Sequence, residues 1–173
     1  MPIIISFISQ KGGVGKSTLA RALAAVASYS MRVRLADLDH RQATVSEWQK
    51  TRVASAGYPA CEVTAYKSVE EALSASADHE LLIFDAPAGA SRQTLELARI
   101  SDLIVQPTGA SADDLRPAVL LFHELVKARI PKERLAAAIC RTMSDTEDAA
   151  ARGYVRNREP RRSRSRRRPE ESR

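Results

Sequence analysis

The feature that most constrains this chain is an apolar segment that runs directly into a glycine-rich loop and then into a helix-forming stretch. Residues 3–8 read IIISFI, residues 10–18 read QKGGVGKST, and residues 16–29 are rich in alanine and leucine. Glycine lets the backbone curl so that successive N–H groups point at an anion, and the following helix adds the positive end of its dipole. A strand, a phosphate-binding loop and a helix are therefore predicted at the amino-terminal end.

The loop almost matches the general pattern G-x-x-x-x-G-K-[ST], with Gln10 in the place of the first glycine. In that pattern Lys16 reaches the β- and γ-phosphates of a nucleotide, and the hydroxyl of Ser17 ligates Mg²⁺. Thr18 is expected to contact the α-phosphate region or to cap the helix. Incidental glycines in a strand-turn-helix are the competing interpretation, and the lysine and hydroxyl at this spacing argue against it. The loop residues predicted to bind ATP are Lys11, Gly12, Gly13, Val14, Gly15, Lys16, Ser17 and Thr18.

Short apolar runs bounded by turn residues recur along the chain and predict further strands. Several runs, such as IIISFI and LLIF, are apolar on both faces, which is typical of parallel strands covered on each side. Helical stretches alternate with them, so we predict an α/β fold with a mainly parallel P-loop sheet flanked by helices on both faces. Strands are expected at residues 3–8, 32–36, 61–65, 81–84, 103–106 and 135–140, and helices at 16–29, 43–56, 69–77, 91–100, 113–128 and 146–154.

The formal net charge of +6 is concentrated at the carboxyl end of the chain. Residues 155–173 contain nine arginines and three glutamates, whereas residues 1–154 hold equal numbers of basic and acidic side chains. A segment so poor in apolar residues cannot bury enough surface to offset the entropy lost on ordering. The sequence therefore predicts a P-loop ATPase domain over 1–154 and a disordered arginine-rich tail over 155–173.

No apolar run approaches the roughly 20 residues that a membrane-spanning helix needs. The first nine residues, MPIIISFIS, lack the positive region and the cleavage site of a signal peptide. We therefore expect a cytoplasmic protein without membrane association. Cys61 and Cys140 have no spacing that indicates a disulfide or a metal site.

The lysine at the start of KGGVGKST, Lys11, resembles the deviant Walker A signature of the ParA/MinD family of ATPases. Three further segments are similar to that family in order and spacing. LADLDHRQATVSEW at 35–48 resembles its switch I, LLIFDAPAG at 81–89 its Walker B strand and switch II, and VQPTGASADDLRP at 105–117 the segment after the next strand in small plasmid-type ParA proteins. The resemblance extends over about residues 3–154.

The resemblance implies roles for residues outside the loop. Asp39 would position the attacking water and lie in the metal shell, with Asp37 as a supporting acceptor, and Asp85 would bind Mg²⁺. The switch II backbone at Gly89 would approach the γ-phosphate, and Lys11 would reach the ATP of a partner subunit. Strand-end aspartates often only cap the next helix, which is the alternative for each of them. The implied catalytic set is Lys11, Lys16 and Asp39, and the implied metal set is Ser17, Asp39 and Asp85.

Two departures from the family pattern bear on function. His40 and Arg41 stand where the family often has proline and glutamine, so the rate of hydrolysis could differ. After Tyr154 the arginine-rich segment stands where small ParA proteins continue with a strand, an adenine-contacting loop and helices. Our hypothesis for this difference is a truncation or a shifted reading frame. We therefore expect the protein to be less stable than a full-length relative.

The function implied by the resemblance is an ATPase switch that dimerises on ATP, binds DNA non-specifically and drives partitioning of a plasmid or chromosome. A ParB-type or other cargo adaptor protein would be its partner, and the ATP-bound form would associate with the nucleoid. One alternative is a nucleotide-gated binding module with little or no hydrolysis, and another is a metabolic P-loop enzyme of related fold. The arginine cluster predicts salt-sensitive contacts with nucleic acid, unless it is a solvated tail without a role.

Overall fold

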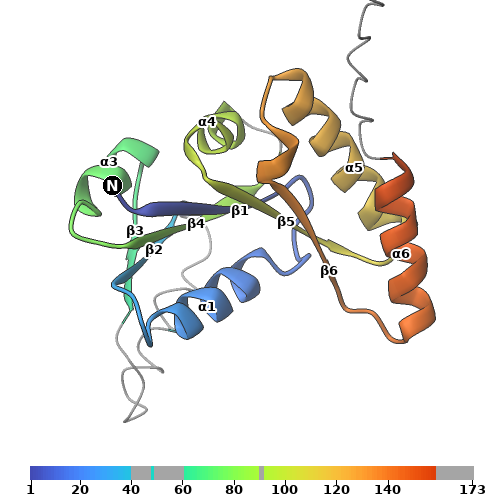
Figure 1. Cartoon of the computed structure of the whole chain (residues 1–173), viewed down its shortest axis with the longest axis horizontal. Helices are drawn as coiled ribbons and strands as arrows, with labels where there is room; N and C mark the ends of the chain where they lie inside the picture. The colour runs from blue at the N-terminus through green and yellow to red at the C-terminus, as the bar shows by residue number, and fades with distance from the viewer. Residues whose placement is uncertain (40–47, 49–60, 90–91, 159–173) are drawn as a thin grey trace, which may run out of the picture.

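The computed structural model describes residues 1–39, 48, 61–89 and 92–158 of the 173-residue chain. In this part of the chain six strands form one sheet in the order β3-β2-β4-β1-β5-β6, and every neighbouring pair is parallel (Figure 1). The predicted α/β fold with a parallel sheet is confirmed. The strands are β1 Ile3–Ser9, β2 Val33–Asp37, β3 Glu62–Ala65, β4 Leu81–Ala88, β5 Leu103–Gly109 and β6 Leu135–Cys140.

Helices cover both faces of the sheet. The helix α1, Lys16–Ala27, packs on one face, and α3, Val69–Ala75, α4, Arg92–Ile100, and α5, Ala112–Lys127, pack on the other (Figure 1). A short 3-10 turn, η1, Lys132–Arg134, leads into β6. The last helix, α6, Asp145–Arg158, lies against α5 and β6 at one end of the sheet (Figure 1).

The two central strands bury side chains on both faces, as their continuous apolar sequences predict. In β1, Ile4 and Ile8 face the cluster beneath α4 and α5, whereas Phe7 faces α1. In β4, Phe84 and Ile83 divide in the same way and are fully buried. Burial of this kind contributes roughly 25 cal/mol for each Å² of apolar surface removed from water. Buried apolar side chains on both faces of β1 and β4 therefore support the loop that follows β1.

The register of the strands brings three carboxyl ends together at one edge of the sheet. Asp37, the last residue of β2, is the partner of Asp85 in β4, and Asp85 is the partner of Phe7 in β1. Side chains at the carboxyl ends of neighbouring parallel strands converge on one crevice, where α/β proteins bind ligands. The fold thus places the predicted aspartates beside the loop at 10–18.

The observed elements differ from the predicted ones mainly at their ends. Five of the six predicted helices are present, and the sixth, at 43–56, falls largely outside the described residues. The helix α6 continues through Arg158, four residues past its predicted end, because Val155 is buried with Ala151 and Leu115 between α6 and α5. Residues 159–173 of the predicted tail lie outside the described part of the chain. Within that part, no helix is long and apolar enough to span a bilayer.

The strand β6 offers a test of how the sheet edge is protected. Its side chains are all half buried; Ala137 faces the cluster with α5 and α6, whereas Ala138 faces the opposite side. A long apolar edge strand invites pairing with another chain, and a lysine on it opposes that pairing. We expect Ala138→Lys to lower the aggregated fraction in light scattering while changing the free energy of unfolding by less than about 1 kcal/mol.

The matched control is Ala137→Lys, one residue away on the packed face. It should lower the free energy of unfolding by about 2 kcal/mol or more, because an ammonium group would enter an apolar cluster. Equal losses of stability in the two variants, measured by chemical denaturation, would contradict this assignment of the two faces.

Candidate nucleotide-binding site

The loop between β1 and α1 has the backbone of an anion cradle. Gly13 and Gly15 hold positive φ angles of 73° and 106°, a left-handed region that favours glycine. Gly15 caps α1 without a side-chain hydrogen bond, and the first turn of the helix carries no acidic residue. The N–H groups of the first turn and the positive end of the α1 dipole are therefore available to an anion, because no carboxylate in that turn competes for them.

Lys16 lies at the bottom of this loop and is 8% exposed. Burial lowers the pKa of its ammonium group, and the carboxylates of Asp85 and Asp39 act in the opposite direction. These three side chains come from α1, from β4 and from the end of β2. The structure thus brings together the predicted phosphate lysine and two of the predicted aspartates.

Asp85 is the most perturbed acid of the site. It is 2% exposed, and burial raises the pKa of its carboxyl to about 6. The neighbouring Asp37 carboxylate raises this pKa further, whereas a hydrogen bond from Ser17 and the charges of Lys16 and Arg21 lower it. One oxygen, Oδ1, has no hydrogen-bond partner among the described residues. A buried carboxylate oxygen without a partner beside a serine hydroxyl fits the oxygen ligands that Mg²⁺ prefers.

Asp37 shapes the chain that leads to Asp39. The Asp37 carboxylate, 5% exposed, accepts a hydrogen bond from the backbone N–H of Asp39 at 2.9 Å. This contact turns the backbone directly after β2 and sets the position of Asp39 next to Lys16. The two neighbouring residues that depart from the family pattern, His40 and Arg41, lie outside the described residues.

Gly89 connects the end of β4 to the loop. Its N–H donates to the carbonyl of Ser9 at 3.0 Å, and its φ angle is 117°. A β-carbon built on Gly12 would lie 3.9 Å from the β-carbon of Ala88. The switch II segment and the phosphate loop therefore lie side by side, as the resemblance implies.

Lys11 and Gln10 are both bound to α5. The ammonium group of Lys11, 46% exposed, forms a hydrogen-bonded ion pair with Asp114 in the first turn of that helix. This bond holds the pKa of the Asp114 carboxyl below its usual range. Gln10 Nε2 donates to Glu124 Oε2 at 3.2 Å. The residues at the start of the loop are therefore attached to the helix that follows β5.

Sequence reasoning missed Asp114 as a partner of Lys11. The segment SADD reads as a helix cap, and it is one, because the side chain of Ser111 accepts a hydrogen bond from the Asp114 N–H. The side chain of Asp114, however, faces the loop and binds Lys11. The signal available in the sequence was a second aspartate in a first turn that needs only one cap.

The end of β6 also borders the loop, which the sequence did not predict. A β-carbon on Gly15 would lie 3.7 Å from Cys140 Sγ. Arg141, the next residue, has a φ angle of 59°. Its charge helps to lower the pKa of the Asp114 carboxyl, and it opposes the rise that burial causes in the pKa of the Cys140 thiol. Arg141 thus adds a positive charge beside the signature lysine.

On α1, Thr18 is exposed and lines a hollow of about 310 Å³ with Arg21 and Trp48.

Comparisons with known proteins agree with this geometry. The family model of the CobQ/CobB/MinD/ParA nucleotide binding domain matches residues 5–163. The maintenance of carboxysome distribution protein A of Gloeobacter kilaueensis is 29% identical over 126 residues, which are 72% of this chain. The chain spans 57% of the length of that curated relative.

Solved structures share the fold at low sequence identity. A plasmid partition protein from Borrelia burgdorferi B31 bound to AMPPNP has a TM-score of 0.61 at 19% identity, covering 86% of this chain and 80% of that one. The pNOB8 ParA structure bound to nonspecific DNA has a TM-score of 0.66 at 13% identity, covering 91% of this chain and 75% of that one.

The raised pKa of Asp85 predicts a specific pH dependence of stability without nucleotide or metal. The folded protein holds this proton more tightly than the unfolded chain, whose value is about 3.8. The free energy of unfolding should therefore fall by about 2–3 kcal/mol as pH rises from about 4 to above 6. Asp85→Asn removes the titrating group, so its stability should lack this component and exceed that of the wild type at pH 7.5. Denaturant titrations across pH would contradict the assignment if both proteins showed the same profile.

Proposed function

Because this chain belongs to the CobQ/CobB/MinD/ParA family of nucleotide-binding domains, we propose that it is an ATPase switch. Its ATP-bound form dimerises, binds DNA non-specifically and drives the partitioning of a plasmid, chromosome or comparable cargo. The observation that carries the proposal is the convergence of Lys16, Ser17 and Asp85 at the phosphate loop, where one buried carboxylate oxygen has no protein partner among the described residues.

The residues of the site fit Mg-ATP. The phosphates would be surrounded by the loop backbone from Lys11 to Thr18 and by the ammonium group of Lys16. The metal would be held by Ser17, Asp85 and Asp39, directly or through water, and would supply charge neutralisation on the phosphate oxygens. Binding of the metal ion beside Asp85 would also offset the free-energy cost of burying the Asp85 carboxylate.

Hydrolysis needs little covalent chemistry from the protein, since positioning and charge stabilisation dominate phosphoryl transfer. Lys16 would stabilise the charge on the β- and γ-phosphates. Asp39, set in place by Asp37, would orient the attacking water. Gly89, beside the loop, would bring its backbone to the γ-phosphate.

Lys11 would complete the active form from the other subunit. In the isolated chain this lysine is paired with Asp114, so it must release Asp114 before it reaches a partner's nucleotide. The pair is partly exposed, and exposed pairs contribute only about 0.2–1 kcal/mol. A triphosphate carries far more negative charge than one carboxylate, so exchange of partners is favourable when a second subunit is present.

Two relatives support the positioning role and the DNA partner of this proposal, and the adaptor is proposed from the family resemblance. One is named for the maintenance of carboxysome distribution, and another was solved on nonspecific DNA. We therefore propose non-specific DNA and a ParB-type or other adaptor as partners, with the ATP-bound dimer on the nucleoid. The arginine-rich residues 159–173 would add salt-sensitive contacts with the same DNA.

The first test separates nucleotide binding from dimerisation. Lys16→Ala should lower the affinity for a fluorescent ATP analogue by about 100-fold, because the phosphates would lose the buried ammonium group that binds them. Lys11→Ala should keep nucleotide binding but lose the ATP-dependent dimer in sedimentation and the ATP-dependent binding to a random DNA duplex. Lys67→Ala, an exposed lysine beyond β3, is the control. DNA binding that ignores ATP in the wild type would overturn the proposed switch.

A second test concerns hydrolysis itself. Asp39→Ala should retain ATP and the dimer but lower phosphate release by at least about 10-fold, because the attacking water loses its orienting group. Phosphate release from the wild type should rise when DNA and an adaptor are added. Release at background level with ATP still bound would instead support a nucleotide-gated binding module.

A further inference from the structure

The helix α5 ends in a backbone motif that normally uses glycine. The N–H of Arg129 donates to the carbonyl of Val126, and the N–H of Ile130 donates to that of Leu125, both at 3.0 Å. These two bonds, together with packing of Ile130 in the same core cluster as Leu125, define a Schellman motif. Its left-handed position is occupied by Arg129, with a φ angle of 67°.

An arginine is an unfavourable choice at this position. A left-handed conformation brings the β-carbon of an L-residue close to a carbonyl oxygen, whereas glycine has no β-carbon. The capping bonds use only the backbone of Arg129, so its side chain contributes nothing to the turn. A strained residue that the local structure does not require points to a role for its side chain, here an exposed guanidinium group.

Arg129 lies within a group of cations. Lys127, Arg129, Lys132 and Arg134, the α5–η1 basic cluster, fall within eight residues that include one acid, Glu133. No ion pair with a described residue is found for any of the four cations. Two of the four cations have a structural explanation. Lys127 lies in the last turn of α5, where a cation complements the helix dipole, and Arg134 Nη1 donates to the carbonyl of Ser101 at 3.4 Å. The cluster thus combines positive charge that is in no ion pair among the described residues with a left-handed backbone position at Arg129.

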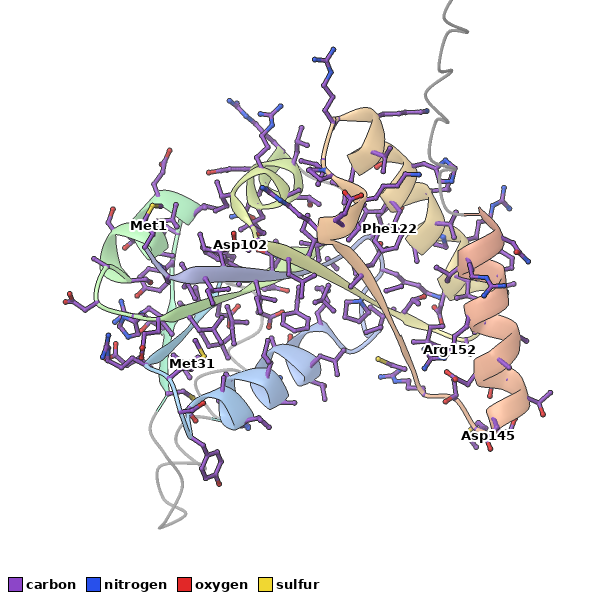
Figure 2. All side chains as sticks on the ribbon, in the orientation of Figure 1. Met1, Met31, Asp102, Phe122, Asp145 and Arg152 are labelled. Carbon is purple, nitrogen blue, oxygen red and sulfur yellow. The ribbon has the colours of Figure 1, made fainter. Side chains whose placement is uncertain are left out.

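The neighbouring helix adds charge to the same side of the molecule. The helix α6 rises from Asp145 past Arg152, and its carboxyl end and that of α5 both lie on the upper side of the view (Figures 1 and 2). Arg156, in the last turn of α6, is exposed. The arginine-rich residues 159–173 follow directly in the sequence.

We propose that the α5–η1 basic cluster is a surface that binds the phosphate backbone of DNA. This proposal deepens the proposed function and rests on it for the identity of the polyanion. Several closely spaced cations without carboxylate partners fit a ladder of phosphates, and the guanidinium of Arg129 can bind one phosphate through two N–H groups. An anionic membrane is a poorer fit, because the cluster contains none of the exposed large apolar side chains of the described residues.

Two substitutions in the full-length chain test the proposal, with anisotropy of a labelled random DNA duplex in the presence of Mg-ATP as the readout. Lys127→Glu should weaken binding at least about 10-fold and lower the slope of log affinity against log salt by about 1 or more. Lys67→Glu, the same charge change at another exposed site, should weaken it less than about twofold. Each comparison is repeated in a full-length chain whose arginines in residues 161–173 are serine, so that the tail cannot mask the cluster.

Arg129→Gly provides the sharper test. If Arg129 only ends the helix, glycine should raise the melting temperature by about 2 °C and leave DNA affinity unchanged. If Arg129 contacts phosphate, the same rise in stability should accompany a fall in DNA affinity of about threefold or more. Stability and affinity moving in opposite directions cannot be explained by misfolding.

The outcomes separate this proposal from the proposed switch. Unchanged DNA affinity in both variants would overturn the cluster while leaving the ATP dependence of the wild type intact. Wild-type binding that ignores ATP but falls in both variants would support the cluster and count against the switch. Loss of binding to phosphatidylglycerol vesicles in the variants, with DNA affinity unchanged, would assign the surface to membranes and overturn the proposal. A fluorescent ATP analogue should bind all variants equally.

Discussion

The arrangement of charges around Asp85 is the interaction on which the rest of the site depends. The parallel register of β2 and β4 sets Asp37 and Asp85 side by side, and burial keeps water from both. Burial is the main cause that raises the pKa of the Asp85 carboxyl to about 6, and repulsion by the neighbouring Asp37 carboxylate adds to it. Lys16 offsets only part of this charge. The site is therefore incomplete as a set of protein groups, and a divalent cation with its nucleotide would supply the missing positive charge.

Such a site is tolerable because β2 and β4, the strands that carry it, are buried over most of their length. Phe84 and Ile83, directly before Asp85, are fully excluded from water on opposite faces of the sheet. Their burial stabilises the fold and so offsets part of the free-energy cost of the neighbouring buried charges. Strand β4 thus carries both core residues and a site residue. Burial of its apolar side chains helps the fold to tolerate the buried carboxylate of Asp85.

The parts that could be predicted from the sequence are those with a local signal. Strand β4 was recognised from its run of apolar residues, and Asp85 from its place at the end of that run. The bond between Lys11 and Asp114 was missed, since the two residues are 103 positions apart and Asp114 reads as part of a helix cap. The strain at Arg129 was equally hidden, because composition does not report a φ angle. The end of α6 was missed because Val155 is buried through a tertiary contact with Leu115.

The helix α5 is the element through which these hidden features meet. Its first turn binds Lys11, its fourth turn bonds Gln10 through Glu124, and its end presents the α5–η1 basic cluster. A helix of 16 residues is stiff, so a change of partner at Lys11 changes the contacts that hold the whole helix in place. When Lys11 exchanges Asp114 for the phosphates of a second subunit, one of the two described ties between the loop and α5 is released. The nucleotide site and the α5–η1 basic cluster therefore lie at opposite ends of one helix.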